Sequence, residues 1–159
     1  MTDLPHILNW RRVNARLTTS GQPSEAQLAE IKALGVRHII NLGPHDNRGA
    51  LVDEAGTVAA LEMNYIYIPV DFERPTDANF GAFTAAIDDL RGAKVHVHCI
   101  YNARVSAFLY RYAKGSNALS EWEAFAIMES IWRPGNDWAA FIGNEEAIGQ
   151  PNRYAGTHY

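Results

Sequence analysis

The sequence predicts a single α/β domain built on a central, mostly parallel sheet of four to five strands, with helices on both faces. Short apolar stretches alternate with segments of helical periodicity, which is typical of α/β proteins. The length of 159 residues is sufficient for one hydrophobic core. With 47% hydrophobic and 20% charged residues, the composition is that of a globular protein rather than a disordered chain.

The first half of the chain reads as strand, helix, strand, helix and strand. Ser24 has the features of a helix N-cap, because Gln27 three residues later completes a capping box. Gly35 follows this helix in the position that often requires a left-handed backbone. We expect strands at 16–20, 36–42 and 65–68, helices at about 25–34 and 53–63, and a polar loop at 43–50.

The second half continues the alternation and then becomes helical. Thr76 can cap a helix whose apolar residues Phe80, Phe83, Ile87 and Leu90 recur at helical spacing. We expect a central strand at 94–98 and further helices at about 104–113, 121–132 and 137–142. The whole chain, 1–159, is predicted to be one domain with its core at about 16–142, and 143–159 a polar tail that wraps the surface or frays.

Charge and cysteine content narrow the function classes. The formal net charge of −4, without a lysine or arginine cluster, argues against nucleic acid or anionic lipid as the main partner. The single cysteine, Cys99, cannot form an internal disulfide and suits a reducing cytoplasm. We see neither the apolar run of a signal peptide nor about 18 consecutive apolar residues, so we expect a cytoplasmic protein without a membrane partner.

The stretch that carries chemistry is residues 95–106, VHVHCIYNARVS. A buried strand ends, a short loop begins with Cys99, and Arg104 opens a helix. A helix N-terminus, loop N–H groups and a guanidinium all favour the thiolate form of a cysteine. The same groups form a cradle for an oxyanion, so the pattern predicts a nucleophile directed at a tetrahedral anion.

At these residues, and at TSGQPS (19–24), YIPVD (67–71) and the strand at 36–42, the sequence resembles the dual-specificity-like cysteine-dependent phosphatases. The resemblance is strongest to their small bacterial branch, which is related to the domain attached to beta-lactamase-like hydrolases. It covers roughly 17–142. It implies hydrolysis of a phosphorylated small molecule or protein, without a cofactor or metal. The oligomeric state is left open.

The resemblance also implies roles for individual residues. Cys99 would attack phosphorus to form a phosphocysteine, Arg104 would bind two phosphate oxygens, and Asp71 would serve as general acid and then as base. Ser106 would bond the thiolate, and His98 would orient the loop from behind. The phosphate-binding loop would consist of Ile100, Tyr101, Asn102, Ala103 and Arg104.

The loop departs from the usual signature of this superfamily. Four residues instead of five separate Cys99 from Arg104, Asn102 stands where glycine is usual, and Val105 separates Arg104 from Ser106. Asparagine tolerates a left-handed backbone better than other residues with a side chain, so the turn remains possible. Either the loop is one residue short, or Ser106 keeps its place and Val105 occupies the position of the arginine.

A second loop, PHDNR at 44–48, follows a strand and should lie on the same edge of the sheet as Cys99. His45 and Arg48 could bind the rest of a substrate there. His96 and His98 share one face of a strand, but no further ligand with suitable spacing completes a metal site.

Three other functions remain open at this point. Rhodanese-like sulfurtransferases have the same four-residue spacing and would carry a persulfide on Cys99. A non-catalytic pseudophosphatase would use the cradle only to bind a phosphorylated partner. A redox sensor is disfavoured because no second cysteine is present to resolve a sulfenate.

Overall fold

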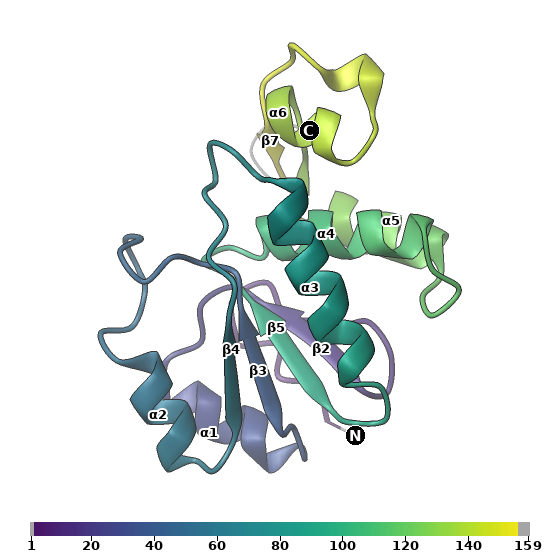
Figure 1. Ribbon diagram of the computed structural model, residues 1–159. Helices are drawn as coiled ribbons and strands as arrows, with labels where there is room; N and C mark the ends of the chain where they lie inside the picture. The colour runs from purple at the N-terminus through teal and green to yellow at the C-terminus, as the bar shows by residue number, and fades with distance from the viewer. Residues whose placement is uncertain (1, 156–159) are drawn as a thin grey trace.

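Five strands form the central sheet in the order β1-β2-β5-β3-β4 (Figure 1). The computed structural model describes residues 2–155. β2, β5, β3 and β4 are parallel, and only the short edge strand β1 is antiparallel to its neighbour. The strands are β1 (Arg11–Arg12), β2 (Leu17–Ser20), β3 (His38–Asn41), β4 (Asn64–Tyr67) and β5 (Val95–His98). The predicted α/β class and the central place of the fifth strand are therefore confirmed.

The helices begin where the sequence provides caps. The Ser24–Gln27 capping box starts α1, Asp53 caps α2, and Thr76 caps α3 in a second capping box with Asn79. Gly35, which follows α1, has the expected positive φ of 96°. The helices are α1 (Glu25–Ala33), α2 (Glu54–Ala60), α3 (Asp77–Asp89), α4 (Ala103–Lys114), α5 (Glu121–Glu129), α6 (Asn136–Phe141) and the 3₁₀ helix η1 (Glu145–Ala147).

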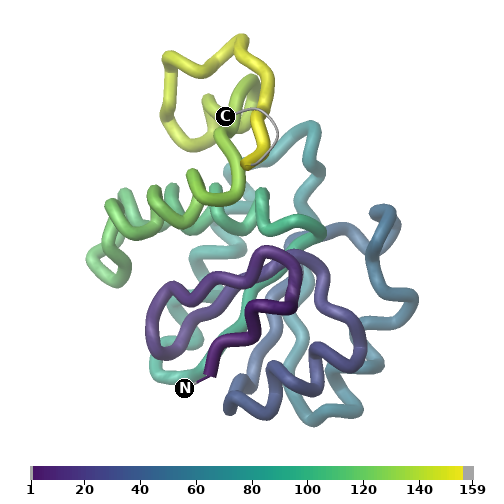
Figure 2. The backbone as a smooth tube through the Cα atoms, turned by 180° about the vertical axis from the view of Figure 1, so that it is seen from behind, coloured from purple at the N-terminus to yellow at the C-terminus, as the bar shows by residue number. Residues whose placement is uncertain are grey.

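Two hydrophobic clusters cover the two faces of the sheet. Ile39 belongs to the cluster with α1 and α2, whereas its neighbour Ile40 belongs to the cluster with α3, α4, α5 and α6. This is the alternation of side chains expected along a strand with both faces covered. The N-terminal segment contributes Leu4, Ile7 and Trp10 to the first cluster, ahead of the expected start of the core, and Figure 2 shows it folded across that side.

Several boundaries differ from the sequence expectation. α2 ends three residues early, at Ala60, and Glu62 then adopts a left-handed φ of 60°. α5 ends at Glu129, because Trp132 enters a strand instead of continuing the helix.

The expected tail is not merely a surface wrap. β6 (Trp132–Arg133) pairs with β7 (Arg153–Tyr154) in a small antiparallel sheet. This pairing gathers the C-terminal part, from α6 onward, at one end of the molecule (Figures 1 and 2). The last expected tail residues, 156–159, lie outside the described residues.

Candidate active site

Cys99 follows directly after β5, the central strand, and is 1% exposed. It is a free thiol at the carboxyl edge of the sheet. The neighbouring segments hold its loop in place: Gln22 N donates to the Ile100 carbonyl at 3.0 Å, and a side chain at Gly21 would come within 2.7 Å of that same oxygen. The loop therefore rests on the segment that follows β2, which belongs to the TSGQPS motif.

The loop turns into α4 through Asn102, whose φ of 73° is left-handed as the sequence led us to expect. Asn102 is completely buried. Its Nδ2 donates to the Asn9 carbonyl at 2.9 Å and to Thr19 Oγ1 at 3.0 Å. These bonds fix the turn that a glycine would otherwise supply.

The backbone N–H groups of residues 100–104 are available to a ligand. Within residues 2–155, none of these five groups donates to a protein acceptor. The first N–H groups of a helix have no partner inside the helix, and they carry the positive end of its dipole. The loop and the start of α4 therefore present a set of donors beside the Cys99 thiol, as expected of an anion cradle.

Arg104 is buried, with 5% exposure, and its guanidinium has only neutral partners. Nη1 donates to the Val70 carbonyl at 3.2 Å and Nη2 to Asn47 Oδ1 at 3.1 Å. The guanidinium also lies over the Phe72 ring, 5.4 Å from its centre. In the part of the chain that the structure describes, no carboxylate pairs with it. A buried cation without a counter-ion is costly, and an anion bound here would offset that cost.

Cys99 and Arg104 line the same depression, of about 210 Å³. Val105, in contrast, is fully buried in the core. The structure therefore places Arg104, and not Val105, beside the cysteine. The depression is lined by Asn47, Phe72, Cys99, Ile100, Tyr101, Ala103, Arg104 and Tyr154.

Behind the cysteine lies a buried polar chain. Gln22 Nε2 donates to Glu54 Oε1 at 2.7 Å, and Glu54 Oε2 lies 2.5 Å from His98 Nε2. His98 Nδ1 in turn lies 3.1 Å from the Cys99 carbonyl oxygen. Burial alone would raise the pKa of Glu54, but the hydrogen bonds and charge of His98 and the bond from Gln22 outweigh it and lower this pKa. His98 thus contacts the start of the loop from behind.

Asp71 lies at the rim, and its carboxylate is outside the depression. It is exposed, and Oδ1 accepts a hydrogen bond from Glu73 N at 2.9 Å. Its two neighbours do reach the site, because Val70 binds Arg104 and Phe72 lines the depression. In this structure the Asp71 side chain caps its own turn.

Ser106 does not contact the thiol, contrary to the role assigned from the sequence. Its Oγ donates to the Ala103 carbonyl at 3.1 Å and accepts from Trp132 Nε1 at 3.2 Å. Two residues past Arg104 correspond to a rotation of about 200° around the helix, so Ser106 faces the core.

The 44–48 loop reaches the site through a different residue than expected. Asn47 lines the depression and binds Arg104, whereas His45 and Arg48 do not line it. His45 instead stacks on Tyr67, with ring centres 3.7 Å apart, and its Nε2 lies 2.7 Å from the Tyr65 hydroxyl.

Two further residues near Cys99, Glu54 and Tyr154, are not evident from the sequence. Glu54 comes directly after the N-cap of α2, where an acidic residue is ordinarily solvated, and no local signal distinguishes it. Tyr154 reaches the depression only because β7 pairs with β6, and two-residue strands carry no readable period.

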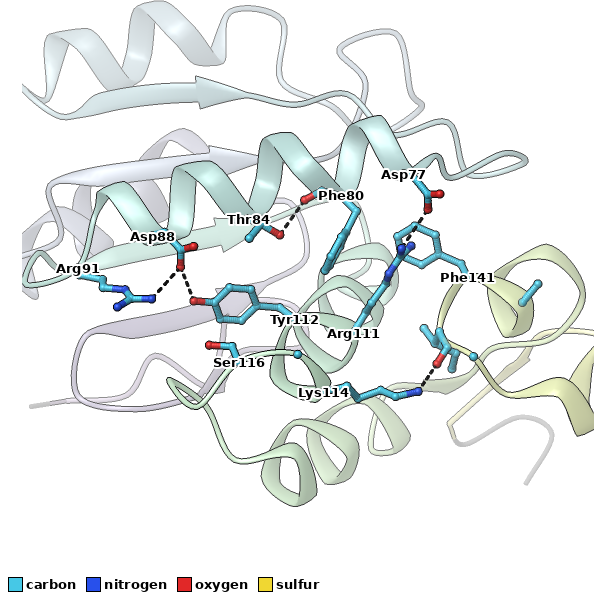
Figure 3. A pocket seen from close by; sticks show the side chains of 14 residues that line it. Asp77, Phe80, Thr84, Asp88, Arg91, Arg111, Tyr112, Lys114, Ser116 and Phe141 are labelled. Carbon is cyan, nitrogen blue, oxygen red and sulfur yellow. Dashed lines mark hydrogen bonds and ion pairs between the residues drawn. The ribbon is translucent and has the colours of Figure 1, made fainter.

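A larger groove, of about 670 Å³, lies between α3, α4 and the end of α6 (Figure 3). Its three cations all have partners: Arg111 pairs with Asp77 at 3.0 Å, Arg91 with Asp88 at 3.2 Å, and Lys114 donates to the Ile142 carbonyl at 2.8 Å. The groove contains no cysteine and its cations are all paired, and we interpret it as packing between elements.

Residues 2–155 contain no group of three or more His, Cys, Asp or Glu side chains arranged to hold a metal ion. The same residues contain no helix with the length and apolar character needed to cross a membrane.

Comparison with known proteins places this geometry in context. No family model matches the chain. A beta-lactamase hydrolase-like protein of Agrobacterium fabrum is 33% identical over 91 residues, which are 55% of this chain and 21% of the relative. The chain thus matches only about a fifth of the length of this curated relative.

Solved structures match over nearly the whole chain. TpbA of P. aeruginosa, crystallised with pTyr, has a TM-score of 0.65 over 94% of this chain and 83% of its own, but its 17% identity supports the fold alone. A provisionally assigned phosphatase (DUF442) from Shewanella putrefaciens CN-32 is 32% identical. Its two crystal structures give TM-scores of 0.73 and 0.76, covering 91% of this chain and 93% and 96% of theirs. The chain therefore belongs to the DUF442 family of provisionally assigned phosphatases and has the cysteine-phosphatase fold.

Proposed function

We propose that the protein is a cysteine-dependent phosphomonoester hydrolase whose chemistry requires no metal. The observation that carries the proposal is the buried Arg104, which has no carboxylate partner among residues 2–155 and shares a small depression with the free thiol of Cys99. The backbone N–H groups of residues 100–104 add donors on the same side. This site combines one buried positive charge, a set of N–H donors and a nucleophile. Such a combination suits a phosphoryl group better than a neutral substrate.

The reaction would proceed in two displacements. The Cys99 thiolate attacks phosphorus, an S–P bond forms, and the bond from phosphorus to the leaving oxygen breaks. Asp71 gives its proton to that oxygen. Water, deprotonated by Asp71, then attacks the phosphocysteine, releasing inorganic phosphate and restoring the thiolate. Arg104 and the loop N–H groups stabilise the charge on the equatorial oxygens in both steps.

Asp71 has to move for this role, because its carboxylate now accepts from Glu73 N. Its neighbours Val70 and Phe72 already contact Arg104, so the movement starts beside the depression. Catalytic hydrogen bonds are often formed only once the substrate is bound. Phosphotyrosine is a reasonable first substrate, since TpbA was crystallised with pTyr.

The experiment compares wild type with Cys99→Ser in two assays, each run with and without a chelator. The first measures hydrolysis of p-nitrophenyl phosphate and the second measures sulfur transfer from thiosulfate to a thiol. We expect chelator-resistant phosphatase activity that Cys99→Ser removes, and a phosphoryl group on Cys99 after rapid acid quench.

Other outcomes would overturn the proposal in distinct ways. Cys99-dependent sulfur transfer without phosphatase activity would favour the sulfurtransferase function. Binding of vanadate without turnover on a wide panel of phosphoesters would favour the pseudophosphatase.

A further inference from the structure

The C-terminal strand β7 brings an aromatic side chain to the reacting centre. Tyr154 lines the depression together with Cys99 and Arg104. Its ring stacks on Trp132, with centres 5.9 Å apart and an interplanar angle of 17°. Trp132 is fully buried and donates to Ser106 on α4. Tyr154 is therefore fixed to the core by a rigid partner rather than lying loosely on the surface.

A second tyrosine faces it. The Tyr101 and Tyr154 rings are perpendicular, with centres 5.6 Å apart. Tyr101 is 38% exposed, and its backbone carbonyl accepts from Asn9 Nδ2 at 2.8 Å, which anchors this part of the loop. Two rings in edge-to-face contact beside Phe72 make three aromatic walls around one cysteine.

The charged residues around the depression limit how many phosphates a substrate can carry. Arg104 is the one cation among its lining residues. Arg153, adjacent to Tyr154 on β7, lines a separate hollow behind the β6–β7 pair, as alternation along a strand dictates. The pKa of Tyr154 is raised, first by burial and then by the nearby Tyr101 and Glu73, with Arg104 opposing, so its phenol remains neutral. The depression therefore matches a single phosphate, and no second cation lines it.

We propose that Tyr154, with Tyr101, selects phosphomonoesters in which the phosphate is attached to a flat aromatic ring, over alkyl and multiply phosphorylated esters. This inference rests on the proposed function and adds the substrate class. An aryl ring with its phosphate on Arg104 would pack against the tyrosine pair where it lines the depression, and aromatic pairs gain about 0.5–1.5 kcal/mol beyond buried area. The C-terminal segment is then part of the substrate site and not only a surface wrap.

The test compares the phenyl-to-butyl ratio of kcat/KM between variants, so that the difference in leaving-group reactivity, which is the same in each variant, cancels. We would determine kcat/KM for phenyl phosphate and for butyl phosphate in wild type, Tyr154→Ala and Tyr154→Phe. Tyr154→Ala should lower the phenyl-to-butyl ratio by about three- to tenfold, which follows from the stacking energy. Tyr154→Phe keeps the ring and should keep the ratio. Trp122→Ala, which removes an aromatic ring that is 76% exposed on α5, is the matched control.

Binding separates this inference from the proposed function. In the Cys99→Ser background, calorimetry with phenylphosphonate and butylphosphonate reports selectivity without turnover. A phenyl preference that Tyr154→Ala reduces supports the inference even if wild type hydrolyses neither ester, an outcome that would defeat only the proposed function. Equal losses on both esters or both phosphonates, or an unchanged ratio, would overturn the role of Tyr154.

Discussion

Helix α4 carries two arginines, Arg104 and Arg111, in contrasting surroundings. Seven residues are almost two helical turns, so both project from nearly the same face of the helix. Both lie against aromatic rings: Arg104 over Phe72, and Arg111 between Phe80 and Phe141 at 4.3 and 4.5 Å. Aromatic contact therefore does not distinguish a binding site from packing in this protein.

The counter-ion makes the difference. Arg111 pairs with the Asp77 carboxylate, whereas the partners of Arg104 are the Val70 carbonyl and the Asn47 amide, both neutral. Arg104 is also the more buried of the two. A buried charge with only neutral hydrogen-bond partners attracts an anion strongly. A charge that is already paired with a carboxylate attracts a further anion much less, because the carboxylate neutralises it. The size of a cavity is a poor guide, because the larger groove surrounds the compensated arginine.

The largest expected effect comes from removing the two arginines in turn. Arg104→Ala should lower kcat/KM for phenyl phosphate by at least about 10³-fold, since one oxyanion donor alone is commonly worth about 10²–10³-fold. Arg104→Lys should also be severely impaired, because an ammonium cannot bridge two oxygens in a planar fork. Arg111→Ala should change the melting temperature and leave kcat/KM as in wild type. Similar losses of activity in both alanine variants would contradict the distinction between the two sites.

The next effect concerns Asp71. Asp71→Asn keeps an oxygen that can accept from Glu73 N, so the turn survives while the transferable proton is removed. We expect turnover of alkyl phosphates to fall by about 10²–10³-fold, the usual range for acid–base catalysis. The loss should shrink for p-nitrophenyl phosphate, whose leaving group is already acidic. If turnover of both substrates stays at the wild-type level, Asp71 only caps its turn.

A smaller effect is expected when Arg104 is given a carboxylate partner. Asn47→Asp would place a carboxylate beside Arg104 and give it the counter-ion that Arg111 already has. Competitive inhibition by inorganic phosphate should weaken by about 10–100-fold, corresponding to a charged hydrogen bond of about 1.5–3 kcal/mol. Asn47→Ala, which removes a neutral partner only, should have less effect on phosphate affinity.

The reverse substitution serves as the control. Asp77→Asn frees Arg111, yet it should create no phosphate site, because Arg111 is more exposed than Arg104, with 29% of its side chain accessible, and does not lie beside the N–H groups at the start of α4. Tighter phosphate binding in Asp77→Asn, measured by calorimetry in the Cys99→Ser background, would show that an unpaired arginine alone is sufficient.

These features were accessible from the sequence to different degrees. The parallel sheet and the strand–loop–helix at Cys99 follow from local patterns, namely apolar runs, capping residues and the left-handed tolerance of Asn102. Arg104 was also identified, since it opens a helix directly after the loop. Helices, strands and caps can be predicted in this way because residues close together in the sequence determine them.

The partners of those residues could not be read in the same way. Asn47 reaches Arg104 across 57 positions and Glu54 reaches His98 across 44, and nothing near either residue in the sequence marks the contact. The 44–48 loop was expected at the correct edge of the sheet, but side-chain direction in an irregular loop follows no period, so His45 and Arg48 were chosen instead. Tyr154 depends on pairing between two-residue strands, which is decided by tertiary packing.

The smallest expected effect concerns the buried Glu54 carboxylate. It is paired with His98, as Arg111 is paired with Asp77, and the prediction tests whether this pairing stabilises the fold. The pKa of Glu54 is lowered in the folded protein, because the hydrogen bonds and charge of His98, with Gln22, outweigh burial. The ionised carboxylate therefore stabilises the fold above its ordinary pKa of 4.5, and this contribution is lost as the pH falls through the lower folded value. Glu54→Gln should lower the free energy of unfolding at pH 7 by about 1–2 kcal/mol. The difference from wild type should shrink as the pH falls below 4.5.

Glu25→Gln, in the first turn of α1 and exposed, is the matched control and should follow the wild-type profile. Urea unfolding across this pH range would measure both, and a Glu54→Gln difference that stays constant into acid would mean that the carboxylate charge does not stabilise the Cys99 loop from behind.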